Sequence, residues 1–405
     1  MQQPYFLNEA GNKKMKDGIM LWYAGKNPFI NTITGTDVTV HSTYNGEPIT
    51  QNYPSLDNAA IVLQADPNTE VYVEGTITEM SNRSSETKIV CHNTALTTLD
   101  CGSRPALTSL DLSHNTALKT LRCYSCLALT SLDLSQNIAL TELNCNSCSA
   151  LTSLDLSHNT ALKTLDCSSC STLTSLDLSQ NTALTGLVCS SCPALTSLDL
   201  SHNTALTGLY CHSCPALTSL DLSHNTALKT LYCHSCPALT SLDLGHNTAL
   251  TDLYCYYCPA LTSLDLSLNT ALKTLRCHSC PALTSLDLSQ NTALTGLDCS
   301  SCSTLTSLDL SHNTALTELR CNYCSALTSL DLSHNTALTG GLFCGGCNYI
   351  ETIKYVAQNT KDAKEIAGLI SNAFATDGNV YCKGTYSSTV QTAATSKGWT
   401  YHTLE

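Results

Sequence analysis

Hydrophobic and polar positions alternate along most of this chain in a 22-residue repeat. The string LTSLDL recurs with its aspartate at 111, 133, 155, 177, 199, 221, 243, 265, 287, 309 and 331. Each unit divides into two halves of 11 residues, such as CPALTSLDLSH and NTALKTLYCHS, and both halves read L-x-x-L-x-[LC]-x-x-[NC]. Alternation of this kind predicts short β-strands that bury one face.

The alternation also predicts which side chains point inward. In the segment 109–113, Leu110 and Leu112 face the interior and Asp111 faces solvent; in the following half, Leu121 and Cys123 face the interior. Each coil is therefore expected to carry two short parallel strands, one on each side of a thin solenoid. A single coil cannot bury its own apolar face, so stability is shared along the stack and the ends need caps.

The two ends of the chain depart from the repeat. Residues 1–85 alternate like strands separated by turn residues and predict a small β-rich domain or cap. The solenoid is expected over 86–347, as about 11–12 coils, and a β/α cap over 348–405. One extra glycine near 340 predicts a bulge where the array ends. In the cap, helices are expected at 359–374 and 387–398 and strands at 379–386 and 399–404.

The repeat resembles the leucine-rich repeat signature L-x-x-L-x-L-x-x-[NC]-x-L, over about residues 91–347. More narrowly, it is similar to the irregular bacterial repeats in which both halves carry the strand pattern, and its cysteine columns resemble the cysteine ladder of a listerial internalin. The resemblance implies a mostly β, right-handed solenoid and a surface-exposed recognition protein. The pattern departs from the family in placing cysteine where a second asparagine is commoner, and the residues at the two ends do not lead us to expect an export signal or a wall-anchoring tail.

Cysteine is the most over-used chemical group, with 25 residues arranged largely as C-x-x-C. The first cysteine of a pair, such as Cys211, takes an inward strand position; the second, Cys214, takes the place that asparagine holds in the other half. We expect that asparagine to bond backbone groups of its own coil and the next, and a thiol to substitute as a weak donor. Reduced, buried ladders are the favoured interpretation, with disulfides within a pair or a zinc knuckle as alternatives. His212 points away from its flanking thiols.

The aspartates form an outward row whose mutual repulsion predicts bound cations or raised pKa values. Calcium bridging at Asp199, Asp221 and Asp243 is a weak candidate; flanking serines and diffuse counter-ions are the alternative. The histidines of the turns (His202, His224 and His246) are expected to form a solvated stripe. Asp, Ser and His recur together in LDLSHN, but identical repetition does not fit a single tuned active site, so no catalytic residues are assigned.

Two outward columns beside the first cysteine vary from coil to coil. They gather aromatic and histidine side chains in the middle of the array: Tyr210, His212, Tyr232, His234, Tyr254, Tyr256, Tyr257, Arg276 and His278. Tyr and Arg dominate interface energetics, so these residues are the candidate partner-binding site. The alternative is that a sheet surface simply tolerates such residues.

The formal net charge of −13 excludes the cationic footprint that nucleic-acid binding needs, and no apolar stretch is long enough to span a membrane. The first residues do not read as a signal peptide. We expect a non-catalytic recognition or adhesion protein without a cofactor, which binds a protein or glycan on a host or neighbouring surface. A structural or host-attachment component of a bacteriophage virion is the alternative. The expected location is accordingly a cell surface, the extracellular space or a virion, and a homo-oligomer or larger assembly is possible.

Overall fold

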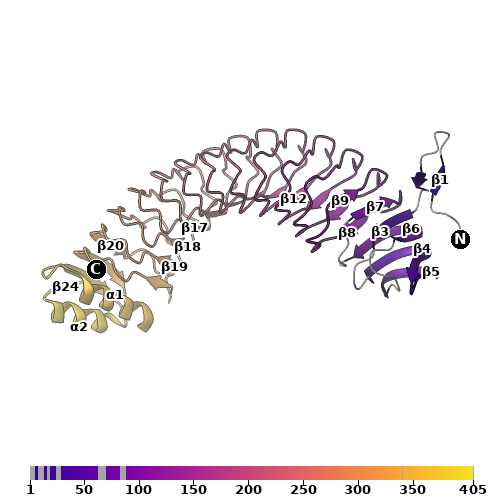
Figure 1. The fold of residues 1–405 in the computed structure, drawn as a ribbon. Coiled ribbons are helices and arrows are strands. Elements are labelled where there is room, and N and C mark those ends of the chain that lie inside the picture. The colour runs from indigo at the N-terminus through magenta and orange to yellow at the C-terminus, as the bar shows by residue number, and fades with distance from the viewer. Residues whose placement is uncertain are drawn as a thin grey trace. The chain divides into compact units, whose positions relative to one another are not determined.

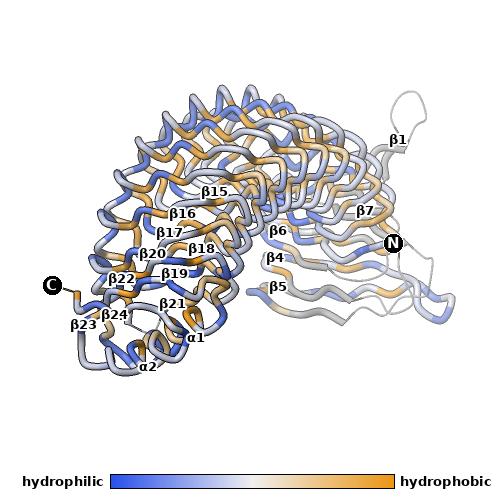
Figure 2. Tube along the Cα trace, turned by 90° about the vertical axis from the view of Figure 1, so that its left-hand side faces the viewer, coloured by the Kyte–Doolittle hydropathy of each residue, from blue (hydrophilic) through white to orange (hydrophobic). Residues whose placement is uncertain are grey.

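The computed structural model describes residues 5–7, 13–15, 19–23, 29–62, 70–82, 88–339 and 341–404. The chain forms two compact units, Met1–Thr204 and Ala205–Glu405, each built around stacked coils (Figure 1). Figure 2 shows hydrophobic positions recurring in register from coil to coil within each unit.

The N-terminal unit opens with antiparallel strands that lead into the first coils. β4 pairs with β5 and β6, while β3 pairs with β6 and β7. β6 and β7 then pair in parallel with β8 and β9 of the first coils, so the sheet continues directly into the repeats. The strands are β1 (Tyr5–Leu7), β2 (Lys13–Met15), β3 (Ile19–Tyr23), β4 (Phe29–Tyr44), β5 (Glu47–Val62), β6 (Glu70–Asn82), β7 (Lys88–His92), β8 (Thr98–Asp100) and β9 (Ser109–Asp111).

One three-residue strand per coil forms the parallel ladder that joins the coils. Leu121 lies opposite Leu143, at an offset of 22 residues, and the central leucine of every such strand is buried. In the N-terminal unit these strands are β10 (Thr120–Arg122), β11 (Glu142–Asn144), β12 (Thr164–Asp166) and β13 (Gly186–Val188). In the C-terminal unit they are β14 (Gly208–Tyr210), β15 (Thr230–Tyr232), β16 (Asp252–Tyr254), β17 (Thr274–Arg276), β18 (Gly296–Asp298), β19 (Glu318–Arg320) and the two-residue β21 (Leu342–Phe343).

The expected second strand of each coil is wrong for the inner coils. Among the described residues, SLDL forms strands only in β9 and in β20 (Ser329–Leu332), which pair with the end modules. Elsewhere the alternation persists without strand pairing. The carboxylate Oδ1 of Asp221 accepts the N–H of Ser223 at 2.9 Å, and the carbonyl of Leu222 accepts the N–H of Asn225 at 3.0 Å. The same local bonds occur after β9 and β20, so what distinguishes those two coils is a partner strand from an end module, β7 beside β9 and the first strand of the C-terminal module beside β20.

Asparagine side chains link consecutive coils through the interior. The amide Nδ2 of Asn247 donates to the carbonyls of Leu222 at 3.1 Å and Asn225 at 2.9 Å, both in the preceding coil. The same pair of bonds recurs at other buried asparagines of the column, for example at Asn159 and Asn313, whereas Asn115 in the first coils donates to the thiol of Cys91 and the carbonyl of Asn93. The side chain therefore reaches only the preceding coil, rather than its own coil and the next as expected from the sequence.

On the other half of the coil, the second cysteine of a pair likewise donates a hydrogen bond to a carbonyl of the preceding coil. The thiol of Cys236 donates to the carbonyl of Cys211 at 3.4 Å, and that of Cys280 donates to Cys255 at 3.3 Å. All 25 cysteines are buried and free of disulfides in the structure. Burial raises the pKa of Cys236 and Cys280 to about 12, so both keep the proton that they donate at neutral pH.

A β/α module closes the C-terminal unit; its two helices and last two strands agree with those expected from the sequence, and its first strand was not expected. The elements are β22 (Thr352–Val356), α1 (Thr360–Asn372), β23 (Asn379–Lys383), α2 (Ser387–Lys397) and β24 (Thr400–Thr403). Helix α1 covers the edge of β21, where Glu365 Oε1 accepts the N–H groups of Cys344 at 2.8 Å and Gly345 at 3.1 Å. Leu319 pairs with Leu342, 23 residues later, so the extra glycine is absorbed before β21. Residue 340 itself, where a bulge was expected, lies outside the described residues.

In the described part of the chain, neither α1 nor α2 has the length and apolar character needed to cross a membrane.

The asparagine column yields a stability prediction. Asn247→Ala removes two interior donors and leaves two buried carbonyls of the preceding coil with fewer partners, at a cost of about 1–3 kcal/mol. Asn247→Cys is the matched control, because a thiol serves the equivalent position in the other half of the coil. Chemical denaturation should rank the wild type as most stable, the cysteine variant next and the alanine variant last; equal losses for the two variants would contradict the donor role.

The thiol ladders predict an all-or-none pattern of reactivity. A chromogenic thiol reagent should find almost no reactive cysteine in the native protein and all 25 after denaturation without reductant. A lower count after denaturation would reveal disulfides, and an ion released on denaturation would reveal a metal site.

Candidate binding surface

The variable outward positions converge on the strand face of the C-terminal unit. The nine residues expected from the sequence lie on β14–β17 and the turns that follow them, and we call them the aromatic patch. They are Tyr210, His212, Tyr232, His234, Tyr254, Tyr256, Tyr257, Arg276 and His278. Consecutive coils are in exact register, with Tyr210 opposite Tyr232 and Tyr232 opposite Tyr254. Like positions therefore stack above one another.

Two parallel stacks of rings run along the patch. In the first, the ring centroids of Tyr210 and Tyr232 are 4.9 Å apart and those of Tyr232 and Tyr254 are 4.1 Å apart. The second passes through His212, His234, Tyr256 and His278, with centroid distances of 4.3, 4.1 and 4.3 Å. Interplanar angles of 9° to 23° make every one of these contacts a face-to-face stack.

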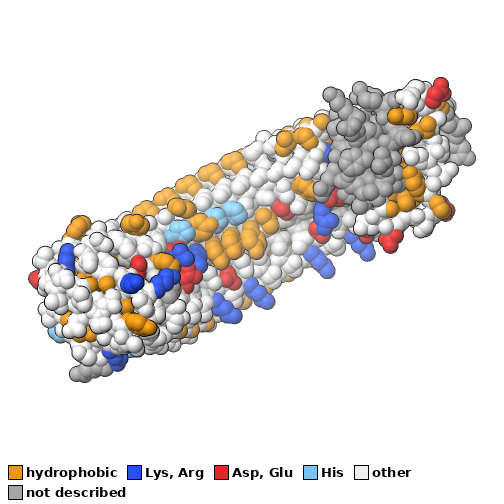
Figure 3. Space-filling model, turned by 90° about the horizontal axis from the view of Figure 1, so that it is seen from below, with side chains coloured by type: hydrophobic (Ala, Val, Ile, Leu, Met, Phe, Trp, Pro, Cys, Tyr) orange, Lys and Arg blue, Asp and Glu red, His pale blue; other side chains and the backbone are white. Residues whose placement is uncertain are grey.

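The stacks present ring edges to solvent rather than ring faces. Tyr232, His234 and Tyr256 each have a neighbouring ring on both faces. The faces of these three rings are therefore covered, which leaves their edges to meet solvent. Figure 3 shows histidines beside a band of hydrophobic side chains on this face, with Lys and Arg along one edge.

The three histidines of the second stack are uncharged at neutral pH. Burial lowers the pKa of His212 and His278, and it lowers that of His234 to about 4, with further lowering by the neighbouring His212 and His278. Asp298 opposes the effect at His278. Burial raises the pKa of the Tyr232 and Tyr256 phenols, so they stay protonated.

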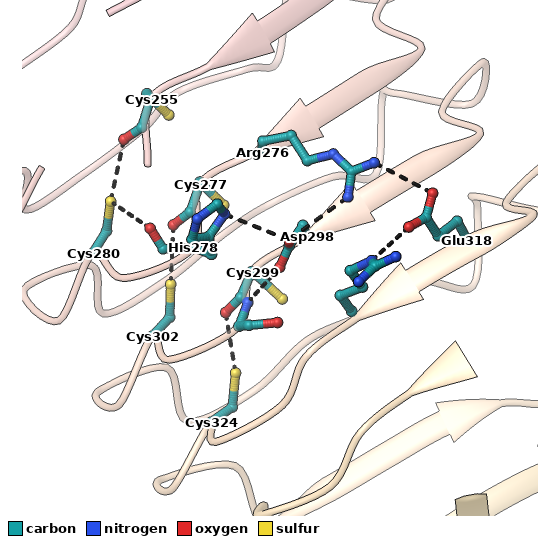
Figure 4. Close-up of polar contacts among 12 residues, drawn as sticks. Cys255, Arg276, Cys277, His278, Cys280, Asp298, Cys299, Cys302, Glu318 and Cys324 are labelled. Atoms are coloured by element: carbon teal, nitrogen blue, oxygen red, sulfur yellow. Dashed lines mark hydrogen bonds and ion pairs between the residues drawn. The ribbon is translucent and has the colours of Figure 1, made fainter. Parts of the chain in front are cut away.

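A charged cluster ends the patch beyond the last ring. Arg276 lies 3.6 Å from the carboxylate of Asp298 and 3.3 Å from that of Glu318, which in turn accepts from Arg320 at 2.6 Å (Figure 4). His278 Nδ1 lies 3.5 Å from the same Asp298 oxygen. Arg276 thus has its charge balanced within the fold, and it marks a boundary between the neutral rings and a zone of ion pairs.

A groove beside the histidine stack was not recognised in the sequence. It has a volume of about 480 Å³ and is lined by the turns that follow the cysteines: Ser235, Pro237, Tyr257, Pro259, Ser279, Pro281 and Ser301. The signal was available, because proline follows the second cysteine only in the coils from 193 to 281, while serine, leucine or asparagine does so elsewhere. Like the rings, the prolines concentrate in the middle of the array.

The aspartate row serves the fold in each coil. Asp199 Oδ1, Asp221 Oδ1 and Asp243 Oδ1 each accept, at 2.9 Å, the backbone N–H two residues later. The expectation of raised pKa values is wrong: at Asp265 and Asp287 the backbone and side chain of the following serine hold the pKa below its usual range. Direct hydrogen bonds to the charged form outweigh repulsion along the row.

No described group of three or more His, Cys, Asp or Glu residues is arranged to hold a metal ion, so calcium bridging at these aspartates stays an untested prediction.

The recurring Asp, Ser and His side chains do meet, but in the wrong order for acyl transfer. Ser113 Oγ donates to Asp111 Oδ1 at 2.7 Å and lies 3.0 Å from His114 Nδ1. The hydroxyl stands between the carboxylate and the imidazole, whereas a catalytic triad places the imidazole in the middle. The arrangement stabilises a turn.

Comparison with known proteins agrees with this architecture. The family model of the BspA-type leucine-rich repeat region matches residues 103–187, 167–262, 189–293 and 248–366. The functional domain of InlJ from Listeria monocytogenes, which includes a cysteine ladder, is 32% identical, with a TM-score of 0.58, over 79% of this chain and 77% of its own. The internalin InlF from L. monocytogenes strain 4b F2365 is 17% identical, with a TM-score of 0.45, over 81% of this chain and 87% of its own. No curated protein matches.

The chain therefore belongs to the BspA-type leucine-rich repeat family and is an irregular bacterial repeat protein with cysteine ladders, as its 22-residue coils, its buried asparagine and cysteine columns and the family match over most of its length all indicate.

Proposed function

We propose that the protein is a non-catalytic recognition or adhesion module and that the aromatic patch binds a partner protein at a cell surface. One observation carries the proposal. The scaffold positions are nearly invariant from coil to coil, yet the outward strand positions gather Tyr and His into two stacks confined to β14–β17 and the turns after them. The similarity to an internalin domain supports a protein-binding or adhesion role.

The chemistry of the patch suits a protein interface. Tyr offers a large and rigid contact area at low conformational-entropy cost, and Arg and Tyr are frequent energetic anchors of interfaces. Stacking of each ring between its neighbours fixes the side chains before a partner arrives. Little further ordering entropy is then lost on binding, which favours affinity.

The direction in which the rings point favours a protein over a glycan as the partner. Sugar rings pack against exposed aromatic faces, but the faces of Tyr232, His234 and Tyr256 are covered by their neighbours. The exposed edges instead offer hydroxyl and imidazole groups that donate to and accept from backbone and side-chain polar groups.

Replacing two central tyrosines tests the patch. Tyr232→Ser/Tyr254→Ser should lower the adhesion of protein-coated beads to cultured cells and to immobilised extracellular proteins by about tenfold or more, because it removes two anchors. The fold should persist, since both side chains lie outside the buried core.

The matched control is Asn144→Ser/Asp166→Ser, which alters the same strand position in two coils of the N-terminal unit. It should leave adhesion unchanged, and a thermal melt should show all three proteins folded. Adhesion that survives loss of both tyrosines would remove the patch as the binding site. Selective binding to a glycan array that depends on the tyrosines would replace the protein partner with a sugar.

The neutral histidine stack predicts a loss of stability in acid. His234 has an ordinary pKa of 6.5 when unfolded and about 4 when folded, so the unfolded chain takes up the proton first as the pH falls. The contribution of His234 to stability should be fully present above pH 6.5 and should decline between pH 6.5 and 4.

Urea titrations at several pH values check this expectation, with His234→Ser as the comparison, because serine holds this position at 168, 190 and 300. The wild type should lose stability more steeply than the variant between pH 6.5 and 4. Parallel pH profiles for the two proteins would show that His234 is not the group involved.

A further inference from the structure

The groove beside the histidine stack combines two features that no scaffold role requires. Its floor is a row of exposed prolines, Pro237, Pro259 and Pro281, contributed by three successive coils. Tyr257 stands among them with 55% of its surface exposed. The ring of Tyr257 packs edge-on against Tyr256 at 5.6 Å and His278 at 5.2 Å, so the groove and the aromatic patch share a border.

Tyr257 adopts a backbone conformation that disfavours a bulky side chain. Its φ is +52°, and the equivalent residue in neighbouring coils, such as Ser235 or Ser279, has the same left-handed conformation. The backbone is held there by a bond from the N–H of Tyr257 to the carbonyl of His278 at 3.0 Å. The fold thus dictates the conformation, and serine meets it in most coils. Tyrosine takes this strained position at 257 and 323, and of the two only Tyr257 lines the groove, so its side chain is placed for a use outside the scaffold.

The chemistry of the groove selects an uncharged occupant. Serine, proline and tyrosine line it, and the histidines at its border are neutral at pH 7. A charged side chain buried there would lose its hydration without gaining a partner, at a large energetic cost. The neutral groove is therefore complementary in charge to an occupant that is itself neutral and apolar.

The periodicity of the groove matches one extended conformation in particular. Strand-linked coils are about 4.8 Å apart, so two coils advance about 9.6 Å. A polyproline II helix advances about 9.3 Å per turn of three residues, so every third residue of such a segment meets an equivalent site. The backbone carbonyls of a polyproline II segment are unpaired and face outward, and the hydroxyls of Ser235, Tyr257 and Ser279 can donate hydrogen bonds to them along the groove. Aromatic side chains lining a groove are the usual receptors for this conformation.

We infer that this groove binds an extended, uncharged, proline-containing segment of the partner protein in the polyproline II conformation, with Tyr257 as its anchor. The inference rests on the proposed recognition function and specifies the partner of that surface.

A fluorescein-labelled ten-residue polyproline peptide is the probe, and its fluorescence anisotropy is measured against the full chain. Saturable binding should be weakened about tenfold or more by Tyr257→Ser, which installs the residue that most coils use and so should leave the melting temperature near that of the wild type. Pro259→Ser, with serine as at 303 and 325, is a second variant that should also weaken binding.

Tyr323→Ser is the matched control. Tyr323 is also exposed, at 67%, and has a φ of +59° at the same turn position, but it does not line the groove, so its replacement should not alter binding. Ten-residue Gly-Ser and polyglutamate peptides should not bind. The inference is overturned if polyproline does not bind saturably, if Gly-Ser binds equally well, or if Tyr257→Ser binds like the wild type. Cell adhesion that still depends on Tyr232 and Tyr254 would then show that the recognition function stands and only this specification of the partner has failed.

Discussion

This structure depends on one constraint: side chains inside each coil must donate hydrogen bonds to the carbonyls of the coil before it. A coil of 22 residues turns its backbone sharply at two places, and each turn leaves carbonyl groups pointing into an apolar interior. Asn247 satisfies one set through its amide, and Cys236 satisfies the other through its thiol. An unpaired buried carbonyl is costly, so the interior columns tolerate almost no variation, and the cysteines that suggest metal or redox chemistry are explained by structure.

The same constraint determines where function can reside. Because each coil sits on the last in strict register, any outward position becomes a column, and neighbours in that column are stacking partners. Tyr232 and Tyr254 are 22 residues apart in sequence, but their rings are 4.1 Å apart in space. In a repeat scaffold, residues that differ between coils and lie far apart in the sequence therefore form a continuous surface. The places where coils differ, rather than the motifs that they share, are the places to look for a binding site.

Much of this could be predicted from the sequence, because the repeat makes each position an internal comparison for the others. The period, the inward and outward faces and the aromatic columns follow from alternation alone. Three features did not. The second strand is absent from inner coils, and SLDL pairs as a strand only beside an end module, in β9 and β20. The carboxylate pKa values fall because a hydrogen bond to the backbone outweighs a distant like charge. The groove could not be predicted because a proline after a cysteine indicates only a turn, and the groove exists only where the turns of several coils lie next to one another.

The stacked rings and the groove also give a strongly acidic protein a largely neutral surface, the one that we propose as the binding site. The aspartates of the LTSLDL row lie in the half of the coil that carries no strand in the inner coils, while the strand half carries the rings. Along the strand face, Arg276 begins a cluster in which Asp298, Glu318 and Arg320 balance one another. The ring stacks are thus separated from the aspartate row around the coil and from the ion-pair cluster along it, while Asp252 of β16 stands within electrostatic range of Tyr232. A partner that docks on the stacks displaces water mainly from ring edges and prolines and desolvates few charged groups, and desolvating an unpaired ion is the costliest step that a polar interface can impose.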